Sequence, residues 1–503
     1  MANRAMITVV VMTAAFMTVL DTTIANVALP HMAGSVSASA DQITWVLTSY
    51  IVASAIMTPT SAWLAGRLGQ KPVFIVSVAG FAATSAMCGA AQTLDQIVLF
   101  RALQGAFGAA MGPLSQSVML DAYPLSERGP AMAIWGMGMM VGPVAGPVLG
   151  GWLTENFSWR WVFYINVPFA LACVAGLVSF LPNSRPNPKL PFDITGFVLL
   201  STALAAFQLF LDRGQNKGWF DSTEIMVEAS IAAVALVLFI IHTLLTDRPF
   251  VPPGLFADGN FVMAMILSMA VGMVVFSMIA LLPPMLESLM AYPVLSAGLV
   301  MAPRGMGSVI SMFLAGRMVQ HVEARILIIG GLVMFALAFI GMSHFALGMG
   351  SWSIMMIGVV QGLGTGFVFT PMTMVAFATL APSLRADGAG LYTLTRNLGN
   401  SVGISIMEAI FATNQQVVHS RLVERLTPDN PLAVRPYLAP VYSLRTPMGL
   451  AALDAEANRQ AAMVSYIDIF HLLFIITALM APLVLMLKPS AAGSETTHEV
   501  MAE

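Results

Sequence analysis

Long apolar stretches, separated by short polar segments, fill most of this chain. A helix of about 20 apolar residues crosses the hydrocarbon core of a bilayer, and backbone groups in hydrocarbon must pair within the protein. We therefore interpret the stretches as transmembrane helices. Fourteen are found, at residues 6–29, 43–66, 72–91, 97–120, 130–153, 160–181, 194–212, 225–245, 260–283, 295–318, 326–346, 352–379, 390–412 and 464–487. The predicted fold class is an all-α, polytopic membrane protein.

The composition supports this interpretation. Hydrophobic residues make up 58% of the chain and charged residues 9%, whereas charged residues make up about a quarter of a soluble protein. The net charge of −3 indicates no nucleic-acid partner. Cys88 and Cys173 both lie inside apolar stretches, so we expect no disulfide framework. We also expect no cleavable signal peptide, because the first stretch is long and is not followed by soluble sequence.

Basic residues predict which side of the membrane each loop faces. With the N-terminus inside, eleven of them lie in short cytoplasmic segments and three in short outer loops, an asymmetry that predicts the orientation. The inner set is Arg4, Arg67, Lys71, Arg128, Arg185, Lys189, Arg248, Arg317, Arg325, Arg385 and Lys488, and the outer set is Arg160, Arg213 and Lys217. An even number of helices then places both termini in the cytoplasm. The long outer segment 413–463 is expected to form either two helical arms, at about 414–426 and 450–463, or a flexible loop without regular structure. The sequence favours the two alternatives equally.

The chain contains an internal repeat. Leu64–Arg67 and Leu314–Arg317 share one sequence, and Gln104–Gly105 recurs as Gln361–Gly362, at offsets of 250 and 257 residues. Two six-helix halves in the same orientation would produce these matches, and parallel halves around a midplane site form a transporter architecture. We therefore divide the chain into an N-terminal half at 1–182, a linker with two inserted helices at 183–259, a C-terminal half at 260–487 that includes the outer segment 413–463, and a cytoplasmic tail at 488–503.

The first apolar stretch carries a single carboxylate, Asp21. A charged side chain in the membrane interior costs roughly 2.5 to 3.5 kcal/mol even on lenient insertion scales, so such residues are usually functional. A carboxyl group buried without a full counter-charge can bind and release a proton near neutral pH. Asp21 therefore indicates a proton-coupled machine. The alternative is a structural acid that is capped by Thr22, Thr23 or an arginine of a neighbouring helix.

Five segments carry a resemblance to a known family. They are Leu20–Pro30 in the first stretch, Leu64–Lys71 after the second, Arg101–Gly105 in the fourth, Gly142–Gly151 in the fifth and Trp159–Pro168 after it. Their sequences are similar to motifs of the major facilitator superfamily, specifically of its fourteen-helix drug:proton antiporter branch, and the chain resembles the EmrB-type multidrug exporters. The resemblance implies two pseudo-symmetric six-helix halves and two inserted helices.

The resemblance also implies roles for residues in proton coupling. Arg101 lies within an apolar stretch and needs a partner. It is expected to sense Asp21 directly or through Gln104, in a pair that loosens between transport states. Glu408 in the thirteenth stretch is a possible auxiliary proton site.

A second set of residues is expected to act in gating. Glycines recur every four residues from Gly138 to Gly150, which lets another helix approach closely, while the intervening prolines permit bending. The implied role is a seal against proton leak, and ordinary packing is the alternative. Gly66 stands where the family usually has an acid, so Asp121 or Glu127 would supply that carboxylate. The gating set is Gly66, Arg67, Lys71, Gly142, Pro143, Gly146, Pro147 and Gly150.

A third set is expected to bind substrate in a mostly apolar pocket with few polar contacts. Chosen by helix position, it is Asn26, Trp45, Tyr50, Gln104, Gln116, Phe369, Tyr392 and Asn397. Arg304 and Arg396, which also lie in apolar stretches, either anchor helices or contact substrate.

The predicted function is export of hydrophobic or amphipathic drugs across the inner membrane in exchange for protons, by alternating access. No cofactor is expected beyond the proton gradient, and neither a nucleotide-binding loop nor a nucleophile elbow indicates an enzyme. The resemblance implies a periplasmic membrane-fusion adaptor of the EmrA type and an outer-membrane channel as partners, with the outer segment as docking element. The alternatives are a dedicated exporter of one metabolite, such as a siderophore or fatty acid, and a non-transporting sensor or passive channel.

Overall fold

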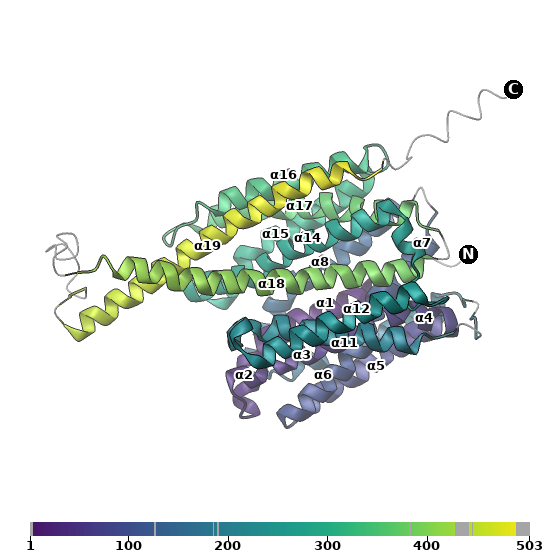
Figure 1. Cartoon of the computed structure of the whole chain (residues 1–503), viewed down its shortest axis with the longest axis horizontal. Helices are drawn as coiled ribbons and strands as arrows, with labels where there is room; N and C mark the ends of the chain where they lie inside the picture. The colour runs from purple at the N-terminus through teal and green to yellow at the C-terminus, as the bar shows by residue number, and fades with distance from the viewer. Residues whose placement is uncertain are drawn as a thin grey trace.

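The computed structural model describes residues 4–124, 127–184, 186–188, 191–381, 384–427, 442–444 and 446–488. All regular elements in these residues are helices, and most run along the long axis of the molecule (Figure 1). The expected tail beyond 488, the tip of the outer segment at 428–441, and the basic residues Arg185 and Lys189 lie outside the described residues.

Within its described residues, the N-terminal bundle contains ten helices. They are α1 (Arg4–Ser35), α2 (Ala40–Ile43), α3 (Trp45–Met57), α4 (Thr60–Leu68), α5 (Gln70–Ala90), α6 (Leu94–Gly108), α7 (Met111–Ala122), α8 (Arg128–Asn156), α9 (Trp161–Tyr164) and α10 (Asn166–Phe180). Two longer helices and a short turn follow, namely α11 (Ile194–Lys217), η2 (Trp219–Asp221) and α12 (Thr223–Leu245).

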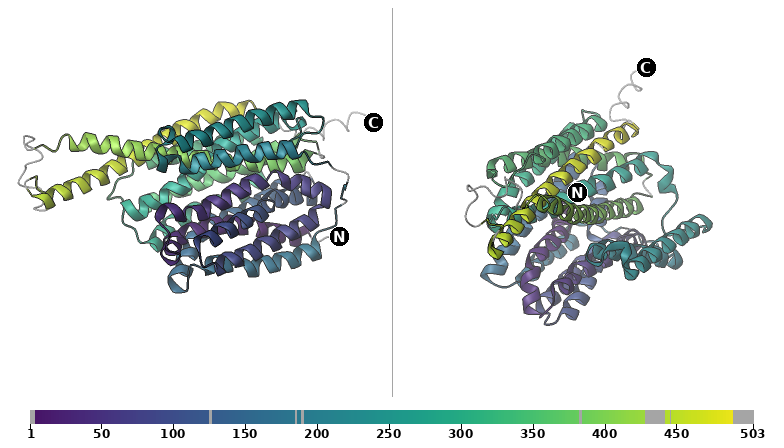
Figure 2. Two further views of the ribbon diagram at one scale, coloured as in Figure 1. Left: turned by 60° about the horizontal axis from the view of Figure 1, so that its bottom comes forward. Right: turned by 60° about the vertical axis from the view of Figure 1, so that its left-hand side comes forward.

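The C-terminal bundle repeats the pattern of long helices. It consists of α13 (Gly254–Ala257), α14 (Gly259–Pro284), the π-helical turn η3 (Met285–Leu289), α15 (Val294–Met318), α16 (Ala324–Met342), α17 (Ser351–Ala378), α18 (Arg385–Val423) and α19 (Pro447–Leu485). The two bundles lie one against the other, as the purple to blue and the green to yellow helices of Figure 2 show.

Twelve helices among the described residues are long and apolar enough to cross a membrane, so the chain is a multi-pass membrane protein. Two of the fourteen expected spans are built differently. The span at 43–66 is divided into α3 and α4, because the helix is interrupted at Pro59, which has no backbone N–H to donate. The span at 390–412 is the middle of α18, where Arg396 and Glu408 lower the hydropathy. Fourteen crossings therefore stay a prediction, as do the orientation of the termini and the domain boundaries.

The internal repeat is visible in the packing. Helix α8 packs along α1, and α18 packs along α14, the first long helix of the C-terminal bundle. A methyl group on Gly142 of α8 would lie 3.1 Å from the backbone nitrogen of Leu20, and one on Gly399 of α18 would lie 2.8 Å from the Cα atom of Met269. Gly142 and Gly399 are separated by the same 257 residues as the two Gln-Gly pairs.

The inserted helices lie at the edge of the boundary between the bundles. Helix α11 packs against both α3 and α18, whereas α12 packs mainly on α11. Only 17% of the apolar window of α12 is buried, so most of this helix faces away from the protein. At the cytoplasmic end predicted for this pair, Asp193 caps α11 by accepting from the Gly196 N–H at 2.8 Å and lies 2.9 Å from His242 of α12.

The outer segment forms two helical arms. Helices α18 and α19 extend together beyond one end of the bundles (Figure 1), so of the two alternatives for residues 414–426 and 450–463 the structure shows the helical one. Asn414 Nδ2 donates to Asp468 Oδ2 at 2.9 Å, and His419 Nε2 lies 2.9 Å from Asp454 Oδ1. The arms are thus joined by polar contacts along their length.

Candidate functional site

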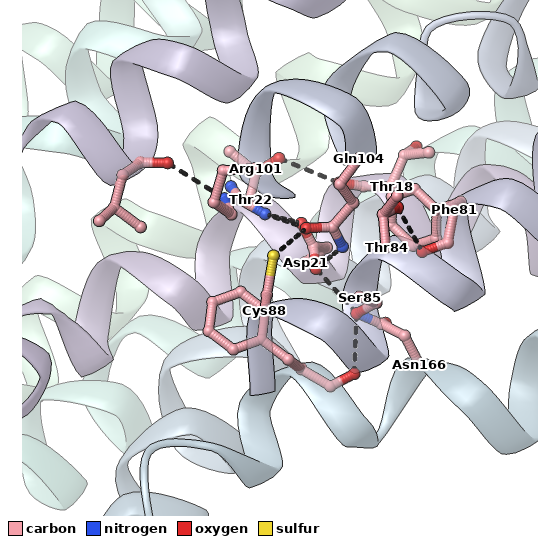
Figure 3. Close-up of polar contacts among 12 residues, drawn as sticks. Thr18, Asp21, Thr22, Phe81, Thr84, Ser85, Cys88, Arg101, Gln104 and Asn166 are labelled. Carbon is pink, nitrogen blue, oxygen red and sulfur yellow. Dashed lines mark hydrogen bonds and ion pairs between the residues drawn. The ribbon is translucent and has the colours of Figure 1, made fainter. Parts of the chain in front are cut away.

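Helix α1 carries Asp21 into the interior of the N-terminal bundle, where its side chain has no exposed surface. Arg101 of α6 donates from Nη1 to Asp21 Oδ2 at 2.5 Å. Gln104 Nε2 and Asn166 Nδ2 each donate to Asp21 Oδ1 at 2.8 Å (Figure 3). One cation and one amide from α6 and a second amide from α10 therefore surround the carboxylate.

The arginine is itself held on several sides. Its Nε donates to the Val46 carbonyl oxygen at 3.1 Å, and Nη1 also donates to Gln104 Oε1 at 2.8 Å. The guanidinium carbon of Arg101 lies 4.2 Å from the ring centre of Tyr50 and 5.7 Å from that of Phe163. Stacking on aromatic faces adds a favourable cation–π contact, so the guanidinium has little freedom in this conformation.

Asn166 and its support were not expected from the sequence. Asn166 Nδ2 also donates to Ser85 Oγ at 3.1 Å, and Ser85 Oγ donates to the Phe163 carbonyl oxygen at 2.8 Å. Cys88 Sγ donates to Gln104 Oε1 at 3.6 Å. Asn166 lies within the motif Trp159–Pro168, but an uncharged amide in a helix that begins nearly 150 residues after Asp21 gives no indication in the sequence that it contacts this carboxylate.

The arrangement decides how Asp21 is capped. Thr22 and Thr23 donate their hydroxyl groups to backbone oxygens one turn earlier in α1, so neither caps the carboxylate. Of the three candidates, Arg101 is the residue that caps Asp21. The same contact is expected of a structural ion pair and of a pair that takes part in proton coupling. A proton that binds Asp21 removes the charge that holds Arg101, so protonation and separation of the two side chains are coupled.

The glycine seam of α8 lies directly on α1 on both sides of Asp21, with Gly142 against Leu20 and Gly146 against Thr23. Thr23 Oγ1 donates to the Gly142 carbonyl oxygen at 3.2 Å. A methyl group on Gly146 would overlap the Thr23 hydroxyl, and one on Gly150 would lie 3.1 Å from the Ile24 carbonyl oxygen. Close helix approach of this kind is typical of small-residue interfaces in membranes. A movement of α8 therefore bears on the turn of α1 that carries the acid.

A cavity of about 490 Å³ lies between the bundles, a size typical of small-molecule sites. Its walls come from α1, α8, α14 and α15, and Asn26, Pro143 and Pro147 are among the residues that line it. Arg304 of α15 and Glu287 of η3 are its charged contributors from the C-terminal bundle. The prolines of α8 thus face the cavity, while the glycines of the same segment face α1.

The bundles close on each other at the opposite end of these helices. A methyl group on Gly129, at the start of α8, would lie 2.7 Å from Val319 Cγ1, and one on Gly316 of α15 would lie 3.2 Å from the Gly129 carbonyl oxygen. Helices α4 and α7 also contact α18. The cavity is therefore formed at the end where α1 finishes and α15 begins, which is the outer side in the predicted orientation.

Comparisons with known proteins agree with this architecture. The model of the Major Facilitator Superfamily matches residues 11–404. The chain belongs to this superfamily. Two curated superfamily relatives are similar over most of their length: the multidrug export protein EmrB of Haemophilus influenzae is 36% identical over 432 residues, covering 85% of this chain and 84% of that protein. The fatty acid resistance protein FarB of Neisseria gonorrhoeae is 35% identical over 416 residues, covering 82% of each.

A solved structure supports the fold alone. The crystal structure of the human organic anion transporter MFSD10 superposes with a TM-score of 0.61 at 13% identity, covering 95% of this chain and all of that one. The expected membership of the EmrB-like efflux group of the superfamily is thereby confirmed by sequence, and the two-bundle superfamily fold by structure. Superfamily members are transporters, so the chain is not an enzyme.

The loop motif Leu64–Lys71 forms hydrogen bonds with the linker and with helix α10. Gly66 occupies the position at which the resemblance implies an acid. The Asn187 N–H donates to the Gly66 carbonyl oxygen at 2.9 Å, and Lys71 Nζ donates to the Val178 carbonyl oxygen at 2.7 Å. The Arg67 guanidinium lies 5.2 Å from the ring centre of Trp63.

The two carboxylates proposed to replace that acid behave differently. Asp121 accepts from Gln70 Nε2 at 3.3 Å and so contacts the loop motif. Glu127 pairs with Arg4 Nη1 at 3.2 Å and contacts the first helix instead. The roles of the gating residues stay predictions.

The residues expected to bind substrate are spread over several places. Asn26 lines the cavity, whereas Tyr50 and Gln104 belong to the Asp21 cluster. Trp45 lies at the outer end of α3, where its ring centre is 5.6 Å from the Arg213 guanidinium. Gln116, Phe369 and Tyr392 are buried, and Asn397 and Glu408 are exposed on α18. Only Asn26 of this set lines the cavity among the described residues, and the binding role of each stays a prediction.

Proposed function

We propose that this protein is a proton-coupled antiporter that exports hydrophobic or amphipathic compounds across the inner membrane by alternating access. The observation that supports it most is the fully buried Asp21–Arg101 pair, with amide donors on its other oxygen, in a helix that also lines the cavity. Ionisable groups at such depth cost free energy and mark proton or substrate pathways.

In the proposed cycle, a proton and a substrate compete through the α1–α8 contact. Protonation of Asp21 releases Arg101, and the turn of α1 that holds Thr23 then shifts against Gly142 and Gly146. Because Pro143 and Pro147 line the cavity, this shift changes its shape. Substrate leaves toward the outer side as the proton binds, and the return step delivers the proton inward. The proton gradient supplies the driving force.

The relatives support the direction and type of transport. One is named a multidrug export protein and another a fatty acid resistance protein. We extend both to this chain as export of apolar compounds. The two arms of α18 and α19 would bind a periplasmic adaptor that leads to an outer-membrane channel, because they extend beyond the bundles at the end where the cavity lies (Figure 1).

Asp21→Asn tests proton coupling. A substrate is first identified by a resistance screen in a pump-deficient host, and its uptake into everted vesicles is then measured with and without a proton uncoupler. Asp21→Asn should abolish the uncoupler-sensitive uptake, whereas Asp95→Asn, which changes an exposed acid at the start of α6, should not. A passive channel or sensor would be indifferent to both substitutions, and unchanged uptake in Asp21→Asn would refute the proposal.

A second candidate is a dedicated exporter of one fatty acid-like metabolite. The similarity to FarB favours it, since FarB is as close to this chain as EmrB is. The same screen separates the two, because a dedicated exporter should confer resistance to a single chemical class.

A further inference from the structure

Arg304 is a cation inside the C-terminal bundle that has no counter-ion in the part of the chain that the structure describes. It lies more than two helical turns inside α15, which begins at Val294, and its side chain lines the cavity. Among the described residues, no carboxylate forms an ion pair with it, and no hydrogen bond or aromatic ring holds its guanidinium. Arginines within membrane spans almost always find a partner. The guanidinium of Arg304 is therefore free to bind a ligand in the cavity.

The internal repeat shows what Arg304 replaces. In the N-terminal half, Gly105 packs against the backbone carbonyl of Tyr50, and in the C-terminal half Gly362 packs against the backbone carbonyl of Arg304. Tyr50 covers Arg101, whose charge is met by Asp21. At the repeated position the cation itself faces the cavity, and none of the described acids of the C-terminal half forms an ion pair with it.

Gln361 provides a second, independent sign of an unfilled site. It is the repeat of Gln104, which binds Asp21, yet it is 1% exposed and neither of its amide atoms has a hydrogen-bond partner in the described part of the chain. Thr365, one turn further along α17, lies on the same helix face and lines the cavity beside Arg304. A buried amide without partners is uncommon in native proteins. Gln361 does not itself line the cavity, but the next residue, Gly362, packs on the Arg304 backbone, so the unpaired amide lies in the wall directly behind the cavity.

The other residues that line the cavity indicate the chemistry of the rest of the ligand. Val27, Ile279 and Met301 line the cavity and offer apolar contact. Its two carboxylates, Glu155 and Glu287, lie at the end of α8 and just beyond the end of α14, and His31 lines the cavity near the end of α1. The cavity thus has a cation at its inner end, apolar walls and acids at its outer end.

We propose that Arg304, supported by Gln361, binds the carboxylate head of an amphipathic anion whose apolar tail lies along the cavity. This inference rests on the proposed export function and names its substrate class. A planar guanidinium fits a carboxylate with two parallel hydrogen bonds. Glu155 and Glu287 repel an anion that has left the inner end, which disfavours its return from the outer side.

Binding to the purified full chain in nanodiscs tests the proposal without requiring transport. Tritiated dodecanoate serves as the probe, with dodecanol and dodecyltrimethylammonium as uncharged and cationic competitors. The wild type should bind dodecanoate at least about tenfold more tightly than either competitor. Arg304→Gln should lose roughly tenfold to a hundredfold in dodecanoate affinity, as expected for a charge-assisted hydrogen bond, and keep its affinity for dodecanol.

Two further variants guard against a folding defect. Arg304→Lys retains the charge and should recover most of the preference for dodecanoate over dodecanol. Arg317→Gln changes an exposed arginine at the far end of the same helix and should behave as wild type. Equal loss of all three ligands in Arg304→Gln, or a wild type that prefers the cation, would overturn the proposal.

The two proposals fail separately. If Asp21→Asn stops proton-coupled export while the wild type shows no preference for dodecanoate, the export function stands and the anion site fails. If the preference depends on Arg304 but Asp21→Asn exports normally, the anion site stands and proton coupling fails.

Discussion

In the folded protein, one guanidinium and two amides take the place of the water that would otherwise solvate the Asp21 carboxylate. Burial of an ion pair costs both partners their water, and the attraction offsets that cost only when further hydrogen bonds complete the shell. Here Gln104 and Asn166 supply those bonds, but Arg101 Nη2 and Asn166 Oδ1 have no partner among the described residues. Two polar atoms of this hydrogen-bonding shell are therefore left without a partner among the described residues, which is compatible with the separation of the pair that we propose.

Arg101→Gln should destabilise the protein more than Arg101→Gln combined with Asp21→Asn. The single change leaves a buried carboxylate without its cation, which costs about 3–5 kcal/mol, whereas the double change removes both charges. Thermal unfolding in detergent should give the lowest midpoint for the single variant and partial recovery for the double. Neither variant should carry out proton-driven export. A double variant less stable than the single one would show that the pair is not the source of the cost.

Much of this cluster could be predicted from the sequence, because a charge in an apolar stretch needs a partner. Asp21 and Arg101 stood out for that reason, and Gln104 stood out because it belongs to the same motif as Arg101 and recurs in the repeat. Asn166 did not, since an amide within an apolar segment is compatible with many positions. The open site at Arg304 could not be predicted either, because the absence of a counter-ion is a fact about three-dimensional neighbours.

Helix α8 presents two different faces through residues that are adjacent in the sequence. Its glycines let α1 approach, and the prolines next to them in sequence line the cavity. The spacing of four predicted one smooth face. The opposite role of Pro143 and Pro147 depends on where the second bundle lies, which no local pattern contains.

Gly146→Ala should impair both stability and export. The added methyl group overlaps the Thr23 hydroxyl, and overpacking of this kind typically costs about 1–3 kcal/mol. Gly330→Ala is the matched control, because nothing lies within 4 Å of the methyl group there. Both changes carry the same gain in helix propensity, so the difference in unfolding midpoint measures the α1–α8 contact. Equal midpoints would contradict the packing described here.

The inserted helix pair should loosen in acid at the end that carries Asp193 and His242, which is the cytoplasmic end in the predicted orientation. Burial alone would raise the pKa of Asp193, but hydrogen bonds from the Gly196 N–H, His242 and the Phe250 N–H outweigh it and lower that pKa below its ordinary value. A carboxylate with a lowered folded-state pKa stabilises the fold above its unfolded pKa of about 3.9 and loses that contribution as the pH falls.

Asp193→Ala should therefore destabilise the α11–α12 pair at neutral pH by about 1 kcal/mol, the usual cost of replacing an N-cap residue by alanine, and less at acid pH. Hydrogen exchange at the start of α11 reports this directly. A difference between wild type and variant that grows toward acid pH would contradict the assignment.

The whole molecule is described in a conformation with its bundles joined at one end and a cavity at the other. The sequence repeat predicted two bundles because the same motifs recur in register. It did not predict which end is closed, because the closing contacts join residues from different halves, such as Gly129 and Val319. Alternating access requires that these contacts break.

A disulfide across the closed end should stop transport. Gly129→Cys with Val319→Cys places two thiols at a point where a methyl group on Gly129 would lie 2.7 Å from Val319 Cγ1, within reach of disulfide geometry. Oxidation should abolish export while ligand binding to the cavity persists, and reduction should restore export. Each single cysteine variant is the control. Export that continues in the cross-linked protein would mean that the closed end does not open.

The most direct measurement is the number of protons released when substrate binds to the purified protein in weakly buffered detergent solution. If Asp21 exchanges its proton against substrate, saturation of the wild type should release protons, and Asp21→Asn should bind substrate with no release. Equal release from the two proteins, or none from the wild type at any pH at which it transports, would contradict the account.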